Sequence, residues 1–342
     1  MKLSMPLDYS GNPVESAHRV AELEKAGLGT VWVAEPYGFD APTLMGYLAA
    51  KTETITIASG ILNIYSRTPG ALLQTAAGLD SVSGGRAAIG LGASGPQVIE
   101  GFHGVRYDRP LARTREIVEI LRMGLRREAL VHDGIYTLPL PADQGVGLGK
   151  ALKLLNRPVR AEVPIWLAAL TAKSVAQTAE IADGWLPFLF VPEKAHDLWG
   201  DALASGAAKR SPDLAPLQIS GGGLVAIGDD VKGALDLMRP LYALYVGGMG
   251  ARGKNFYFDL ACSYGFEAEA REIQDLYLAG RPRDAEAKVP LEWLEASNLV
   301  GPASYVKERI EAYRAAGVTD LQVTVAAGDP VATIGKLREW AA

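Results

Sequence analysis

The feature that most constrains this chain is a regular alternation of short apolar segments with longer helix-like ones. Eight segments are apolar almost throughout, as parallel strands buried on both faces are, instead of alternating apolar and polar residues. The helix-like segments between them often begin with Pro and end at Gly, as helix boundaries do. The pattern predicts strands at residues 3–7, 31–34, 55–58, 87–91, 164–169, 185–190, 217–227 and 321–325.

Eight such strand–helix units in 342 residues predict a single α/β domain, a (β/α)8 TIM barrel. A doubly wound sheet is the competing fold, and the lack of a Gly-x-Gly-x-x-Gly after the first strand disfavours it. One unbroken helix is expected at 231–245. Two insertions interrupt the repeat, at about 128–163 and 247–300. We interpret the first as a short hairpin with a Gly-rich loop, and the second as either a wall of the site or a subunit contact.

The composition argues against several classes of function. The formal net charge is −5, so nucleic-acid binding is not expected. We find no apolar stretch of about 18 residues that would span a membrane. The strand-like start and the single Cys262 favour a cytoplasmic location, and the four scattered histidines disfavour a metal site. These features leave a small-molecule substrate as the expected partner.

The active site of a TIM barrel lies at the carboxyl ends of its strands, and the residues expected there are mostly small. They include Gly60, Gly92, Gly95, Ala168–Ala169 and Gly221–Gly223. Such residues let a flat ligand lie against the backbone. Few acids, bases or nucleophiles accompany them, which indicates that a bound cofactor supplies the chemistry. For any one of these residues helix–strand packing is the better explanation, but taken together they favour the cofactor.

Five segments resemble the luciferase-like monooxygenase superfamily, and more narrowly its coenzyme F420-dependent branch, which includes methylenetetrahydromethanopterin reductases. They are SGILNIYSRTP (59–69), LGASGPQVIEGFHG (91–104), PIWLAALTAKSV (164–175), ADGWLP (182–187) and GPASYVKERIEAYRAAGVTDLQV (301–323). The resemblance covers essentially the whole chain. It implies an oxidoreductase that passes a hydride between C5 of the deazaflavin F420 and a small organic molecule. Because family members are commonly oligomers, it also implies a homo-oligomer.

The resemblance further implies where the cofactor lies. In F420-dependent members the third strand ends in a bulge with a non-prolyl cis peptide behind the ring, and this bulge matches Gly60–Ile61. The helix that begins at Thr171 would offer its free N–H groups to the cofactor's phosphate, although Thr171 is equally well explained as a helix N-cap. The residues that the resemblance assigns to the cofactor are Gly60, Ile61, Asn63, Ala93, Ser94, Gly95, Gln97, Ala168, Ala169, Leu170, Thr171 and Lys173.

The end of the second strand departs from the family pattern. Several relatives carry Asp-His there, whereas this chain has Glu35–Pro36. Glu35 can keep the acidic role, but Pro36 cannot transfer a proton. We therefore expect Glu35 and Tyr37 to be the catalytic residues, with Glu100 and His103 as weaker candidates for the general acid. His103 is as well explained as a surface loop residue.

Several alternatives stay open from the sequence. Asn63 and Tyr65 have a plainer interpretation as loop-turn and helix-capping residues, and Arg67 as a surface charge. A second alternative within the same superfamily is FMN as the cofactor, which would make the protein a monooxygenase supplied by a separate reductase. A third alternative is a binding protein that holds a flavin or deazaflavin without catalysis, and the missing histidine beside Glu35 is its best support.

Overall fold

The computed structural model describes residues 1–8 and 11–342. Eight parallel strands close into a barrel, which confirms the predicted (β/α)8 fold. The last strand of the barrel pairs with both its predecessor and the first strand, and this closes the ring. In chain order the strands are β1 (Lys2–Pro6), β2 (Thr30–Val33), β3 (Thr56–Ser59), β5 (Ala87–Gly92), β6 (Ile165–Ala168), β7 (Gly184–Leu186), β8 (Gln218–Ile227) and β10 (Asp320–Val325).

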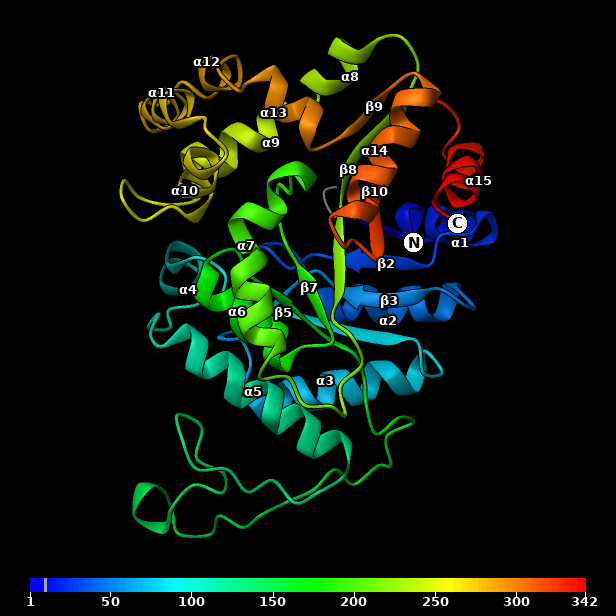
Figure 1. Cartoon of the computed structure of the whole chain (residues 1–342). Coiled ribbons are helices and arrows are strands. Elements are labelled where there is room, and N and C mark those ends of the chain that lie inside the picture. The colour runs from blue at the N-terminus through cyan, green and yellow to red at the C-terminus, as the bar shows by residue number, and fades with distance from the viewer. Residues whose placement is uncertain (9–10) are drawn as a thin grey trace.

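Helices cover the outside of this barrel (Figure 1). Their starts carry the expected local signals: the Asn12 side chain accepts a hydrogen bond from the Val14 N–H, and Pro13 occupies the first turn. The first helix ends at Gly27, whose φ of 109° lies in the left-handed region. The covering helices are α1 (Pro13–Ala26), α2 (Ala41–Lys51), α3 (Pro69–Val82), α5 (Pro110–Leu125), α6 (Ala172–Ile181), α7 (Pro192–Ala207), α14 (Ala303–Ala315) and α15 (Pro330–Ala341).

The inside of the barrel is filled by side chains and is not a channel. Trp32, Ala58, Ala88 and Trp166 form a separate buried cluster there, in which the two indole rings meet edge to face at 5.1 Å. A Cβ atom on Gly184 would lie 2.2 Å from the ring of Trp166, so only glycine leaves room for this tryptophan. Ligands must therefore bind above this plug, at the mouth of the barrel.

Some elements differ from the prediction. The third strand breaks after β3 and resumes as β4 (Leu62–Asn63), which pairs with β5. A short extra strand, β9 (Leu299–Gly301), pairs with the far end of β8. The prediction of a single helix at 231–245 is wrong. The chain instead forms α8 (Val231–Asp236), α9 (Arg239–Ala243) and the π-helical turn η2 (Leu244–Gly248). Pro240 explains the break, because proline is tolerated in a first turn but not in a helix interior.

The first insertion forms an extended lobe beyond α5, at the bottom of Figure 1. The expected hairpin is reduced to one antiparallel bridge between His132 and Leu138, and a 3₁₀ turn, η1 (Ala142–Gln144), follows. Several aliphatic side chains of the lobe are exposed, among them Val146, Leu148 and Leu155. The expected homo-oligomer stays a prediction.

The second insertion is helical. It contains α10 (Phe256–Ser263), α11 (Glu267–Leu278), α12 (Pro282–Glu286) and α13 (Leu291–Ala296), which lie together at the upper left of Figure 1. Its Tyr257 ring lies 5.8 Å from Phe188, just past the end of β7. The insertion therefore forms part of the wall around the barrel mouth. Within the described ranges, no helix has the length and apolar character needed to cross a membrane.

Candidate functional site

Three neighbouring strands build an apolar floor at the barrel mouth. The peptide bond between Gly60 and Ile61 is cis, as the resemblance predicts. A Cβ atom on Gly92 would lie 2.2 Å from Cδ1 of Ile61 and 3.3 Å from Cβ of Ala168, so Ile61 occupies the space that glycine leaves free. Ala168 is exposed although it belongs to a central strand. We call Ile61, Gly92 and Ala168 the Ile61 floor; Ile61 is half-buried and Gly92 is buried.

Beyond this floor, Asn63 is buried and organises the following turn. Its Oδ1 accepts hydrogen bonds from the backbone N–H groups of Tyr65 (3.1 Å) and Ser66 (2.7 Å), which confirms its interpretation as a turn residue. The other end of the same amide lies 3.1 Å from Nε2 of His103. The structure thus brings together two residues that are forty positions apart in the sequence.

Glu35 makes a two-fold ion pair with Arg67 instead of standing free. The guanidinium donates to both carboxylate oxygens, at 2.6 and 2.7 Å, and Oε2 also accepts from the Ala41 N–H at 2.9 Å. The side chains are only 8% and 19% exposed, so the surface-charge interpretation of Arg67 is wrong. The hydrogen bonds to Glu35 raise the pKa of Arg67, against the opposing effect of burial. This pair anchors the loop after β2 to the loop after β4.

The loop after β5 contains four of the predicted cofactor residues. Ser94 has a φ of 56°, in the left-handed region that side chains seldom adopt. Gly95 is the N-cap of a six-residue helix, α4 (Pro96–Gly101), which the sequence analysis did not predict. Ala93 is half-buried, and Gln97 on α4 is exposed. The loop therefore presents backbone and small side chains toward the mouth.

The loop after β6 is held rigidly. The carbonyls of Ala169 and Leu170 accept hydrogen bonds from the indole N–H groups of Trp185 (2.9 Å) and Trp199 (2.8 Å). Thr171 is the N-cap of α6: its Oγ1 accepts from the Ser174 N–H at 3.4 Å, and Oγ of Ser174 accepts from the Thr171 N–H at 3.1 Å. This capping box leaves other first-turn N–H groups without intrahelical partners.

The first turn of α6 also carries a positive charge. Lys173 lies in the first turn of this helix and is exposed. Together with the free N–H groups, it makes the α6 N-terminus suitable for an anion such as a phosphate. The capping role of Thr171 is confirmed and is compatible with this second role.

Exposed aromatic rings stand on two other loops of the mouth. Tyr37, the second predicted catalytic residue, is 60% exposed, and its ring centroid lies 6.4 Å from that of Phe102, which is 62% exposed. Phe102 in turn meets the imidazole of His103 edge to face at 5.1 Å. The structure therefore joins Tyr37, Phe102 and His103 in one wall, and the phenylalanine is a member that sequence reasoning missed.

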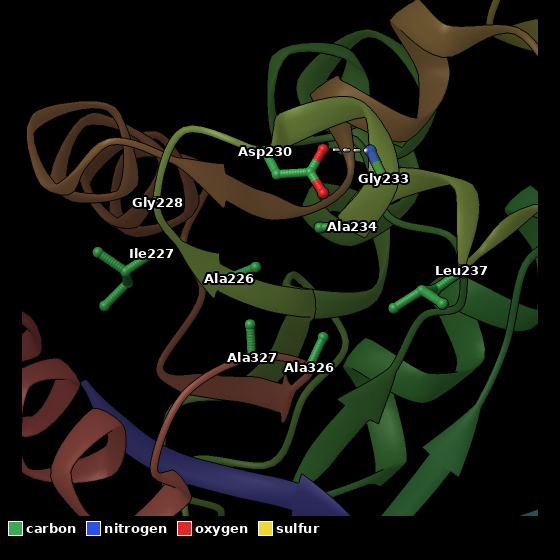
Figure 2. A pocket seen from close by; sticks show the side chains of 9 residues that line it. All are labelled: Ala226, Ile227, Gly228, Asp230, Gly233, Ala234, Leu237, Ala326 and Ala327. Atoms are coloured by element: carbon green, nitrogen blue, oxygen red, sulfur yellow. Dashed lines mark hydrogen bonds between the residues drawn. The ribbon is translucent and has the colours of Figure 1, made fainter.

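A cavity of about 250 Å³ lies elsewhere on the mouth, at the ends of β8 and β10 (Figure 2). Alanine and aliphatic side chains dominate its lining, and Asp230 caps the Gly233 N–H at 2.9 Å. A carboxylate at this position disfavours an anion. None of the predicted cofactor residues lines this cavity, so it is separate from the Ile61 floor.

The glycines of β8 are explained by packing. A Cβ on Gly222 would lie 1.9 Å from the carbonyl oxygen of Gln322, and one on Gly223 would lie 2.4 Å from that of Ser297. Gly221 packs in the same way against Val318, at 2.9 Å. These three residues lie within β8, before its carboxyl end, so the expectation that they stand at a strand end is wrong. They allow close packing inside the sheet, and the cofactor interpretation is not needed for them.

The fold and this arrangement define the class of protein. The chain belongs to the luciferase-like monooxygenase family, whose model matches residues 2–320. A Mycobacterium tuberculosis protein named as a coenzyme F420-dependent oxidoreductase is 38% identical over 98% of this chain and 99% of its own length. The 5,10-methylenetetrahydromethanopterin reductase of Archaeoglobus fulgidus is 25% identical over 93% of this chain and 90% of its own.

Two solved structures share the fold. The coenzyme F420-dependent tetrahydromethanopterin reductase from Methanopyrus kandleri superposes with a TM-score of 0.80 at 22% identity, covering 98% of this chain and 96% of that one. An F420-dependent secondary alcohol dehydrogenase, solved with an F420–acetone adduct, gives 0.77 at 16% identity, covering 100% and 99%. At these identities the likeness supports the barrel fold.

Proposed function

We propose that this protein is a coenzyme F420-dependent oxidoreductase that transfers a hydride between the deazaflavin and a small organic substrate. The observation that carries the proposal is the Ile61 floor. It is apolar, it is exposed at Ala168 and partly exposed at Ile61, and it rises from three adjacent strand ends, where TIM-barrel enzymes bind their ligands. The similarity to the mycobacterial relative supports F420 as the cofactor.

The residues present fit this cofactor. Ile61 would support one face of a flat ring and leave the other face to the substrate. The α6 N-terminus with Lys173 would hold the phosphate of the cofactor's tail. When bound, F420 supplies a carbon, C5, that accepts or donates a hydride. The protein's own contribution is to position the two reactants and to exclude water.

The experiment that tests this proposal is a pair of titrations, with F420 and with FMN, followed by tryptophan fluorescence. Trp166 and Trp185 lie in the strands that end at the site, so quenching is expected. We expect a dissociation constant for F420 in the micromolar range or lower and much weaker binding of FMN. Tighter binding of FMN would instead support a monooxygenase, and binding of F420 without any turnover would support a non-catalytic binding protein.

A pair of glycine variants makes the titration specific for the Ile61 floor. Gly92→Ala would drive Ile61 out of its position, because the new Cβ would lie 2.2 Å from Cδ1. Gly101→Ala is the matched control, since nothing lies within 4 Å of its Cβ position. We expect the first variant to weaken F420 binding at least about tenfold (~1.4 kcal/mol) and the second to leave it unchanged. Equal affinities would mean that the ring does not bind on this floor.

A further inference from the structure

The hydrogen bonds of Asn63 determine which nitrogen of His103 carries the proton. Two backbone N–H groups donate to Oδ1 of Asn63, so this atom must be the carbonyl oxygen and the amide nitrogen must face His103. An amide nitrogen can only donate, so Nε2 of His103 accepts and the ring proton lies on Nδ1. Turning the amide over would break two hydrogen bonds of a side chain that is only 3% exposed.

The imidazole ring of His103 is therefore a hydrogen-bond donor at Nδ1. A proton on Nε2 would face the N–H of Asn63, and two donors cannot bond to each other. Within residues 1–8 and 11–342, the side chain of His103 makes no hydrogen bond other than that with Asn63, so its Nδ1–H has no partner there. His103 is half-buried, and its ring contacts the exposed Phe102 of the aromatic wall.

The wall around His103 is largely apolar and carries no positive charge of its own. The segments 35–40 and 91–103 contain neither Lys nor Arg. Of their acids, Glu35 is paired with Arg67. Asp40 and Glu100 are exposed carboxylates that accept from backbone N–H groups, and they disfavour an anionic substrate. What these segments present to the mouth is aromatic surface, from the exposed Tyr37 and Phe102.

We propose that the substrate is an uncharged, apolar ketone, or the corresponding secondary alcohol in the reverse direction. Its oxygen accepts the hydrogen bond from Nδ1–H of His103, and its apolar part packs against Tyr37 and Phe102. This inference rests on the proposed function. A neutral imidazole that donates to a carbonyl oxygen stabilises the negative charge that develops there during hydride addition.

The reduction balances as follows. The carbonyl carbon receives a hydride from reduced F420, so a C–H bond forms and the π bond of the carbonyl breaks. The oxygen takes a proton from water and the ketone becomes a secondary alcohol. Reduced F420 loses the hydride and one proton, which returns to water, and is thereby oxidised. His103 keeps its own proton throughout.

The substrate test uses acetophenone and 4-acetylbenzoate, two ketones that differ by one charged group. Each is mixed with the protein and reduced F420, and the recovery of oxidised F420 absorbance is followed. We expect kcat/KM to be at least tenfold higher for acetophenone. If F420 binds but neither ketone oxidises it, or if the charged ketone is preferred, this inference is overturned while the proposed function stands.

The role of His103 is tested by His103→Phe, with His196→Phe as the matched control because His196 is 96% exposed. We expect kcat/KM for acetophenone to fall about a hundredfold in the first variant and to stay unchanged in the second. The F420 dissociation constant should change less than twofold in both. Unchanged turnover in His103→Phe would overturn the role of this residue.

A spectroscopic measurement on the cofactor-free protein is independent of turnover. The chain has four histidines, so ¹⁵N-histidine labelling gives few ring signals, and His103→Phe assigns the one of interest. We expect His103 in the Nδ1–H form, and Asn63→Ala should abolish this preference. His132, whose Nδ1 lies 2.8 Å from the Tyr136 carbonyl, is an internal reference for that form. An Nε2–H form of His103 would overturn the inference, whatever cofactor the protein binds.

Discussion

Glu35 illustrates how an acid beside an active site can be committed to structure. Three donors engage its two oxygens: both ends of the Arg67 guanidinium fork and the Ala41 N–H. Such two-fold pairing fixes geometry as well as charge. Its burial means that the loss of one partner would leave the other charged and poorly solvated. Glu35 therefore has the position expected of a catalytic acid, but its hydrogen bonds are those of a residue that holds two loops together.

Glu35→Gln should destabilise the protein by about 3 kcal/mol, because it leaves the Arg67 guanidinium buried without its counter-ion. Urea unfolding of the wild type and the variant measures this difference. Glu53→Gln, at an exposed carboxylate, is the control and should have almost no effect. In the double variant Glu35→Gln/Arg67→Met, part of the lost stability should return. A variant that unfolds like the wild type but loses turnover would instead identify Glu35 as a catalytic acid.

At the scale of single elements, α6 is expected to serve both stability and binding. Thr171→Ala removes its N-cap and should cost about 1 kcal/mol in the free energy of unfolding. It should also weaken F420 binding, since the first turn of α6 is where we place the phosphate. Thr68→Ala removes the chemically identical N-cap of α3 and is the matched control. We expect equal stability losses from the two changes, with weaker F420 binding only in Thr171→Ala, measured by urea unfolding and fluorescence titration. Equal affinities would place the phosphate elsewhere.

Most elements could be predicted from the sequence because their signals are local. Burial on both faces makes the strands uniformly apolar, and α1 is marked at its ends by Asn12, Pro13 and Gly27. The break between β3 and β4 has no such signal, and only the family resemblance predicted the bulge at Gly60–Ile61. The break of the helix expected at 231–245 did have a local signal, which is Pro240.

The partners within the site could not be predicted from the sequence. Glu35 and Arg67 are 32 positions apart, and Asn63 and His103 are 40 apart. Each residue could be assigned to its own strand end, but which side chains meet depends on how neighbouring loops lie over the barrel. The exposure of a side chain could not be predicted either. Arginine is usually a surface residue, but the loop that carries Arg67 buries its side chain.

At the scale of the whole molecule, a small polar network ties the barrel together where it closes. Asp320, the first residue of β10, accepts hydrogen bonds through Oδ2 from the hydroxyl groups of Ser4 (2.6 Å) and Ser220 (2.8 Å). These serines belong to β1 and β8, the two strands that β10 joins. The chain ends also meet nearby, since the N-terminal amine donates to the Ala341 carbonyl at 2.5 Å, and both ends lie on one side of Figure 1.

This network makes barrel closure sensitive to pH. Burial raises the pKa of Asp320 above its ordinary value, and the hydroxyl groups of Ser4 and Ser220, the indole of Trp32 and the charge of Lys2 only partly oppose this. The folded state therefore holds the proton of this carboxyl group more tightly than the unfolded chain, where its pKa is about 4. Below that pH the contribution of Asp320 to stability is fully present, and it is lost as the pH rises toward the folded-state pKa.

Asp320→Asn should be more stable than the wild type at neutral pH, and its advantage should shrink as the pH falls toward about 4. An amide stays uncharged throughout this range, and its oxygen can still accept from Ser4 and Ser220. Urea unfolding of both proteins between about pH 4 and 8 measures the difference. Asp143→Asn, in the exposed η1 turn, is the control and should give a difference that is constant with pH. A constant or opposite trend for Asp320→Asn would mean that the barrel closes around a carboxylate, with the two serines and its surroundings compensating fully for the buried charge.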